Sequence, residues 1–201
     1  MIVDRDAATV SSDLTSCTFE HMCYECTLDK KTFKVYDTAG LNDGDQGRIP
    51  HWKALEYLYT LIRQLNSVSL LIYCFRGRIT QNTQANWNLF NEVVFKEQVP
   101  IILVVTCLEH ETDWDDLARL KRTKEAFEAY GMKPKEVTLI ISSRGKQNEY
   151  ADLYQRSQAK LRTLVKGYHR VKPWSMGKDE WSERTFEKLS TSLPSLLPVP
   201  Q

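Results

Sequence analysis

Continuous hydrophobic runs alternate along the chain with segments in which hydrophobic residues recur every three or four positions. Three runs, at residues 68–75, 99–106 and 136–141, are typical of strands buried on both faces of a sheet. The helical spacing predicts helices over residues 51–66, 80–95, 114–130 and 150–168. Strands and helices in this order predict βαβ units in an α/β fold: a doubly wound, mostly parallel sheet between two helical layers.

The two ends of the chain have a different pattern from its middle. Residues 1–17 are polar and predict a loop, whereas residues 18–28 and 32–36 predict two strands of a hairpin joined by Asp29-Lys30-Lys31. After residue 168 the chain contains four prolines and one weak helical segment at 178–189. We therefore expect a main domain over residues 1–168 and an extension over residues 169–201 that is loosely packed or disordered at its end.

Composition narrows the class of protein. The 201 residues suit one α/β domain with an extra segment, and the 42% of hydrophobic residues can form a sizeable core. A net charge of +1 gives no indication of a nucleic-acid partner, and no apolar run approaches the roughly 18 residues of a membrane span. The five cysteines, an odd number without a signal-peptide core before them, indicate reduced thiols in a cytoplasmic setting.

Ligands of doubly wound sheets bind at the carboxyl ends of the strands, so the loops there are the first place to look for chemistry. The strand at residues 32–36 stops at Asp-Thr-Ala-Gly. Asp37 is suited to hold a Mg²⁺ ion, directly or through water. Gly40 lets a backbone amide approach a terminal phosphate because no Cβ stands in the way.

Two later loops carry groups suited to reading a base. The second loop contains Thr106 and Glu109, whose carboxylate could accept hydrogen bonds from the N1 and N2 edge of guanine. The third contains Ser142 and Ser143, small residues that let backbone amides reach the base oxygen. Upstream, the hydroxyl of Thr18 could complete a Mg²⁺ shell.

In the order of these loops the chain resembles the Ras-like P-loop GTPases. The phrases SSDLTSCT, DTAGLNDG, LLIYCFRGR and PIILVVTCLE look closest to fungal G-domain proteins, which are similar in turn to septin-like and immunity-associated GTPases. The resemblance covers residues 1–168 and implies a G domain that binds GTP or GDP with Mg²⁺. It places Thr18 in the first switch, Asp37 to Gly40 in the second, Thr106 to Glu109 at the base and Ser142 to Arg144 in the last loop.

The phosphate-cradling loop of that family is missing. No Gly-x-x-x-x-Gly-Lys-Ser/Thr precedes Thr18, and the strand and helix that flank this loop are absent with it. We expect Met1 to be an internal methionine of an N-terminally truncated form. The alternative is a nucleotide-free relative that acts as a protein-interaction module.

Three substitutions also depart from the family. Cys107 stands where a Lys usually packs on the base, and Glu109 is one methylene longer than the usual Asp. Leu41 follows Gly40 where Ras-like enzymes have a Gln that orients the attacking water. Any hydrolysis is then expected to be slow or to require a partner, either a second copy of the chain or another protein.

Each candidate residue also has a simpler interpretation. Asp37 could cap a turn, and Thr18 could be an ordinary strand residue. Glu109 begins an acidic stretch that could be a solvated loop, while Ser142 and Ser143 suit any loop between a strand and a helix. A further pattern, Cys-Tyr-Glu-Cys at residues 23–26, has the spacing of zinc sites, but no second pair accompanies it and the two thiols would lie on opposite faces of a strand.

Overall fold

The computed structural model describes residues 1–3, 22–38, 51–65 and 67–175. The chain divides into two compact units. The sheet unit consists of Met1–Ile2 and Ser69–Trp174, and the hairpin unit of Val3–Val68 and Ser175–Gln201. We describe each unit by itself.

The hairpin unit contains two antiparallel strands, β1 (Met22–Leu28) and β2 (Lys31–Asp37), and the helix α1 (His51–Gln64). The two residues between the strands, Asp29 and Lys30, have φ of 47° and 65°. Positive φ at both positions defines a two-residue turn whose twist matches that of the strands. The predicted hairpin is confirmed, with a turn one residue shorter than expected.

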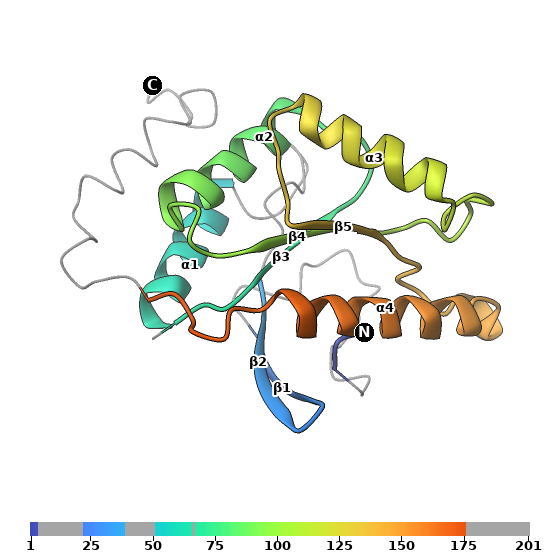
Figure 1. The fold of residues 1–201 in the computed structure, drawn as a ribbon, viewed down its shortest axis with the longest axis horizontal. Helices are drawn as coiled ribbons and strands as arrows, with labels where there is room; N and C mark the ends of the chain where they lie inside the picture. Colours follow the sequence, from blue (N-terminus) through green and yellow to red (C-terminus); the bar gives the residue numbers. More distant parts are fainter. Residues whose placement is uncertain (4–21, 39–50, 66, 176–201) are drawn as a thin grey trace. The chain divides into compact units, whose positions relative to one another are not determined.

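The sheet unit is built on three parallel strands in the order β3-β4-β5 (Figure 1). These are β3 (Leu71–Phe75), β4 (Ile101–Val105) and β5 (Glu136–Leu139). In register, Leu71 lies opposite Ile101, and Ile102 lies opposite Glu136. The predicted α/β fold with a parallel sheet is confirmed for this unit. Every residue of β4 is buried, whereas β3 is only partly buried, contrary to the expectation of burial on both faces.

Helices cover both faces of this sheet, as Figure 1 shows. The helices α2 (Gln81–Asn88) and α3 (Leu117–Ala129) pack on one face, where Trp87 and Phe127 contact alternate residues of the strands. The helix α4 (Ala151–Tyr168) packs on the other face through Leu161. The sheet unit therefore has three layers, and its core is the set of strand residues between them.

Two predicted helices differ from the observed ones. The helix expected over residues 80–95 begins at a capping box formed by Thr80 and Thr83, but its second half is the π-helical segment η1 (Leu89–Val94). The helix expected from residue 114 begins at Leu117, because the Asp116 carboxylate accepts a hydrogen bond from the Ala118 amide and caps the helix there. Trp114 lies in the preceding loop and is buried in the core.

Glu136, at the amino end of β5, connects both helical layers. Its carboxylate accepts a hydrogen bond from the Tyr168 hydroxyl of α4 at 3.2 Å, and it lies 2.5 Å from the ammonium of Lys124 in α3. Burial alone would raise the pKa of Glu136, but the bonds from Lys124, the Val137 amide and Tyr168 lower it more, so that the pKa lies below its ordinary value.

The segment after α4 continues along the sheet unit as far as it is described. The Arg170 amide donates to the Ser69 carbonyl, and the Trp174 ring lies 5.3 Å from that of Phe95, measured between centroids. The rest of the predicted extension, including the helical segment at 178–189, lies outside the described residues. Across the parts that the structure describes, no helix combines the length and apolarity needed to cross a membrane.

Candidate functional site

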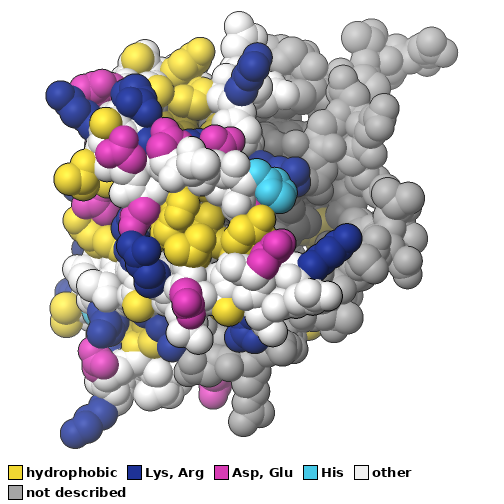
Figure 2. Space-filling view, turned by 90° about the vertical axis from the view of Figure 1, so that its right-hand side faces the viewer, with side chains coloured by type: hydrophobic (Ala, Val, Ile, Leu, Met, Phe, Trp, Pro, Cys, Tyr) yellow, Lys and Arg dark blue, Asp and Glu magenta, His cyan; other side chains and the backbone are white. Residues whose placement is uncertain are grey.

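The loops that follow β4 and β5 meet at the carboxyl edge of the sheet, on the right-hand side of Figure 1. Figure 2 faces this side and shows hydrophobic side chains near its centre with acidic and basic side chains around them. Thr106, Glu109, Ser142 and Ser143 all lie in these two loops. The structure therefore brings together the four residues that the sequence proposed for the base.

Glu109 is the point at which the two loops join. Its Oε1 atom accepts hydrogen bonds from the Ser142 amide, the Ser142 hydroxyl and the Ser143 amide, each at 2.9 Å. None of these three bonds reaches Oε2 of the same carboxylate. In the described part of the chain, no Lys or Arg forms an ion pair with Glu109. The carboxylate is thus held by neutral donors, with one oxygen outside this set of bonds.

The same contacts set the protonation of Glu109. Partial burial would by itself raise the pKa of this carboxyl group. The hydrogen bonds from its own backbone, from the Ser142 side chain and from the amides of Ser142 and Ser143 outweigh burial and lower the pKa. Glu109 is therefore ionised at neutral pH and presents a negative charge that no described side chain neutralises.

A tight turn fixes the backbone of Glu109. The Glu111 amide donates to the Leu108 carbonyl at 3.0 Å, so that Glu109 and His110 are the central residues of the turn. Leu108, at the start of the turn, is only 6% exposed and belongs to the core. Before it, Cys107 has a φ of 61°, and its amide lies 3.4 Å from the Ser142 hydroxyl oxygen, to which it donates. This left-handed residue directs the chain from β4 into the turn.

Thr106 has a different role from that of Glu109. Its amide donates to the Phe75 carbonyl at 2.9 Å, and its hydroxyl donates to the same oxygen at 3.3 Å. Both donors of Thr106 therefore hold the end of β3 against the end of β4. Thr106 therefore stabilises the ends of the two strands next to the site and has no bond to Glu109 in the structure.

The loop after β5 is held mainly by hydrogen bonds that its own backbone amides donate. The Gly145 amide donates to the Ser143 hydroxyl at 3.0 Å, and the Tyr150 amide donates to the Arg144 carbonyl at 2.9 Å. Gly145 has a φ of 71°, and a Cβ placed there would lie 2.5 Å from Cδ2 of Tyr150. Only glycine fits this position without displacing its neighbours.

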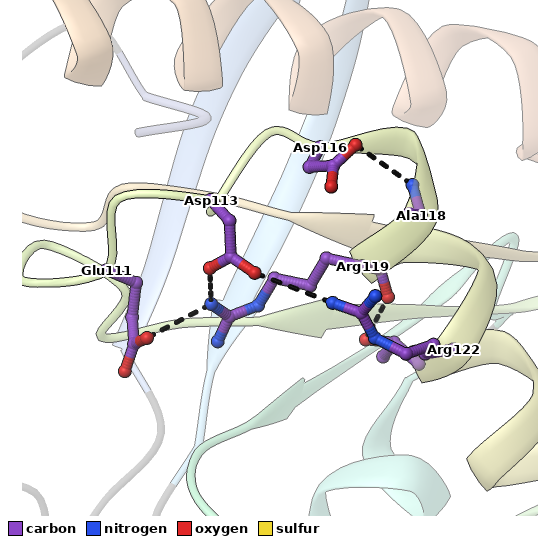
Figure 3. Close-up of polar contacts among 7 residues, drawn as sticks. Glu111, Asp113, Asp116, Ala118, Arg119 and Arg122 are labelled. Atoms are coloured by element: carbon purple, nitrogen blue, oxygen red, sulfur yellow. Dashed lines mark hydrogen bonds and ion pairs between the residues drawn. The ribbon is translucent and has the colours of Figure 1, made fainter.

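The loop after β4 is tied to α3 by charged groups (Figure 3). The Arg119 guanidinium donates to the carboxylates of Glu111, at 3.1 Å, and of Asp113. Arg122 lies 3.5 Å from the other oxygen of Asp113. Glu111 closes the turn that carries Glu109, so Arg119 fixes the end of that turn opposite to the buried Leu108.

Contacts with α4 hold the next part of the same loop. Arg156 and Lys160 lie 2.7 Å and 3.4 Å from the two oxygens of Asp115. The Arg156 guanidinium also lies over the ring of Trp114, 5.8 Å from its centroid, and Trp114 is 7% exposed. Charged contacts from both helical layers therefore converge on one loop.

Of the residues proposed for Mg²⁺ and phosphate, the structure describes only Asp37, which belongs to the hairpin unit. Asp37 is the last residue of β2, lies opposite Met22 and is exposed. Thr18 and Gly40 lie outside the described residues. Within the described ranges, no group of three or more acidic, histidine or cysteine side chains is arranged to hold a metal ion. In the Cys-Tyr-Glu-Cys pattern, Cys23 is exposed and Cys26 is buried on β1.

Sequence reasoning missed the residues that support Glu109. These are Arg119, which pairs with the acidic loop, and Gly145, which allows the tight return of the β5 loop. One signal was present, because an acidic stretch directly before a helix rich in basic residues favours ion pairs between the two. A glycine directly after Ser-Ser-Arg is likewise a sign of positive φ. Which carboxylate pairs with which arginine depends on side-chain distances that spacing does not give.

A scan of the chain against models of protein families found no match, and a search among curated proteins found no similar protein.

Proposed function

We propose that the chain is a guanine-nucleotide-binding domain of the P-loop GTPase class, although the phosphate-cradling sequence is absent from these 201 residues. The complete protein would be a nucleotide-dependent switch that binds GTP or GDP with Mg²⁺. Thr18, Asp37 and Gly40 would address Mg²⁺ and the terminal phosphate. Glu109 would address the base, held in place by Ser142 and Ser143.

The observation that carries this proposal is the state of Glu109. Three neutral donors fix one oxygen of this ionised carboxylate, and no cation among the described residues pairs with it, so its second oxygen can accept bonds from a ligand. It fits a ligand that brings two N–H donors to the remaining oxygen, and the N1 and N2 edge of guanine is such a group. The second oxygen of Glu109 therefore supports binding of the base end of the nucleotide.

Binding of a fluorescent GTP analogue tests the proposal. We expect Mg²⁺-dependent binding in a version extended upstream that carries Gly-x-x-x-x-Gly-Lys-Ser/Thr, and weaker binding in the chain of 201 residues. Glu109→Gln in the extended version should reduce affinity about tenfold, since the acceptor loses its charge. Glu128→Gln, on the exposed surface of α3, serves as the matched control and should leave affinity unchanged. An extended version that does not bind GTP would refute the proposal.

A second candidate function is a nucleotide-free interaction module. The observation in its favour is the absence of the phosphate-cradling sequence from the chain. Such a module would bind a protein partner or a second copy of the chain without GTP. Saturable binding of the GTP analogue to the chain of 201 residues would rule it out.

A further inference from the structure

Glu109 occupies the hydrogen-bond donors that a base oxygen would need. The small residues of the loop after β5 are suited to this role because their backbone amides can approach a base. In the structure, however, the amides of Ser142 and Ser143 both donate to Oε1 of Glu109 at 2.9 Å. A later donor of the same loop, the Gly145 amide, is directed to the Ser143 hydroxyl. An oxygen of the protein thus stands where an oxygen of the ligand is expected.

The length of the side chain makes this possible. Both ends of the turn that carries Glu109 are fixed, because Leu108 is buried before it and Arg119 holds Glu111 after it. An Asp on the same backbone would end one carbon–carbon bond earlier, about 1.5 Å short of the present position. A bond of 2.9 Å to the Ser143 amide would then be stretched beyond hydrogen-bonding distance.

We propose that Glu109 determines the specificity of this site by occupying the Ser143 amide in place of the base oxygen, so that a purine is recognised by its donor edge alone. The inference rests on the proposed function and makes it more specific. A purine nucleotide with the N1 and N2 donors but with sulfur in place of the oxygen at position 6 should bind as well as GTP. A purine nucleotide without the 2-amino group should bind less well.

Competition binding with three nucleotides tests the inference. GTP, 6-thio-GTP and ITP are titrated against a bound fluorescent GTP analogue, in the chain and in its upstream-extended version. We expect GTP and 6-thio-GTP to agree within about twofold, and ITP to bind about tenfold more weakly, because one donor to Glu109 is lost. In Glu109→Asp the Ser143 amide becomes available, and GTP should bind about fivefold more tightly than 6-thio-GTP. Glu128→Asp makes the same chemical change on the surface of α3 and should reproduce the wild-type ratios.

A measurement without nucleotide tests the contact itself. In ¹H–¹⁵N spectra, the amide signals of Ser142 and Ser143 should shift together as Glu109 is protonated, since both donate to the same oxygen. Glu109→Gln should abolish this shared titration, and Glu109→Asp should remove both amides from it, because both bonds end at the same oxygen. A Ser143 signal that does not follow Glu109 would overturn the inference whether or not a nucleotide binds.

The outcomes separate the two proposals. A preference of the wild type for GTP over 6-thio-GTP of tenfold or more would mean that another donor, such as the Arg144 amide, reads the oxygen, and it would overturn this inference alone. An unchanged ratio in Glu109→Asp would do the same. If no nucleotide displaces the probe in either version, the proposed function fails, and the inference about specificity fails with it.

Discussion

The two loops that meet at the candidate site are held in different ways. The loop after β4, residues 106–116, is long and is held by side chains: Leu108 and Trp114 in the core, and ion pairs from α3 and α4. The loop after β5, which begins at Ile140, is held by hydrogen bonds that its backbone amides donate, by the buried Ile140 and Ile141, and by a glycine with positive φ. The first should respond to changes in burial and charge, and the second to changes in backbone conformation.

This difference indicates a division of roles around Glu109. The β4 loop supplies the charged group and fixes its backbone. The β5 loop supplies the neutral donors that orient the carboxylate. A site built in this way can hold an ionised carboxylate without a cation. In a loop held by ion pairs alone, the cations of the loop would pair with that carboxylate.

Among changes in the two loops, Trp114→Ala should have the largest effect on the free energy of unfolding. The side chain is 7% exposed, and its removal leaves a cavity below the β4 loop. We expect a loss of about 3 kcal/mol in the free energy of unfolding, measured by urea denaturation. Leu117→Ala is the control, because Leu117 is 80% exposed three residues further on, and it should cost less than about 0.5 kcal/mol. Equal losses would mean that Trp114 does not anchor the loop.

Gly145→Ala should be the most damaging single change in the β5 loop. An alanine at this position would have to keep an unfavourable φ of 71°, and its Cβ would lie 2.5 Å from Cδ2 of the Tyr150 ring. We expect a loss of about 2 kcal/mol by the same urea measurement. Gly131→Ala separates the two causes, because Gly131 has a φ of 75° with nothing within 4 Å, and it should cost about 1 kcal/mol. A smaller loss at Gly145 than at Gly131 would contradict the predicted clash.

Arg119→Ala should weaken the β4 loop by a smaller amount. The side chain is 22% exposed and contacts two carboxylates, of which that of Asp113 is 44% exposed, so solvent screens much of the interaction. We expect a loss of about 1 kcal/mol that shrinks when salt is added. Lys121→Ala removes an exposed pair with Glu125 on the same helix and should cost about 0.3 kcal/mol. A loss at Arg119 that does not change with salt would indicate packing, with no part played by charge.

The pH dependence of stability should show the smallest effect. The pKa of Glu109 is lower in the folded chain than its ordinary value of 4.5, so the unfolded chain binds more protons in acid. Its contribution is therefore present above pH 4.5 and is lost as the pH falls through the folded pKa. In denaturation measurements between about pH 3 and pH 6, the free energy of unfolding of Glu109→Gln should change less with pH than that of the wild type. If Glu109→Gln keeps the wild-type slope, the carboxylate is not held as described.

The sequence predicted the elements better than the contacts between them. The continuous run in β4 and the alternation in the hairpin follow from burial on two faces or one, which a sequence expresses directly. The predicted start of α3 was wrong because Trp114 has helical spacing but anchors the preceding loop. The helix begins only after Asp116, which caps it. The bonds from Ser142 and Ser143 to Glu109 join residues more than 30 positions apart. Local pattern placed both groups at one edge of the sheet and could not give their distances.

The two units also place different demands on folding. The β1–β2 hairpin pairs residues that are close in sequence, beginning with Leu28 and Lys31, and such ribbons close in about 1–10 μs. Each parallel pairing in the sheet unit must wait for a whole crossover, since Leu71 pairs with Ile101 and Ile102 with Glu136. Until the chain has been synthesised beyond β5, the fully apolar strand β4 lacks one of its two neighbours. Pulse-labelled hydrogen exchange should therefore protect the amides of β1 and β2 before those of β4.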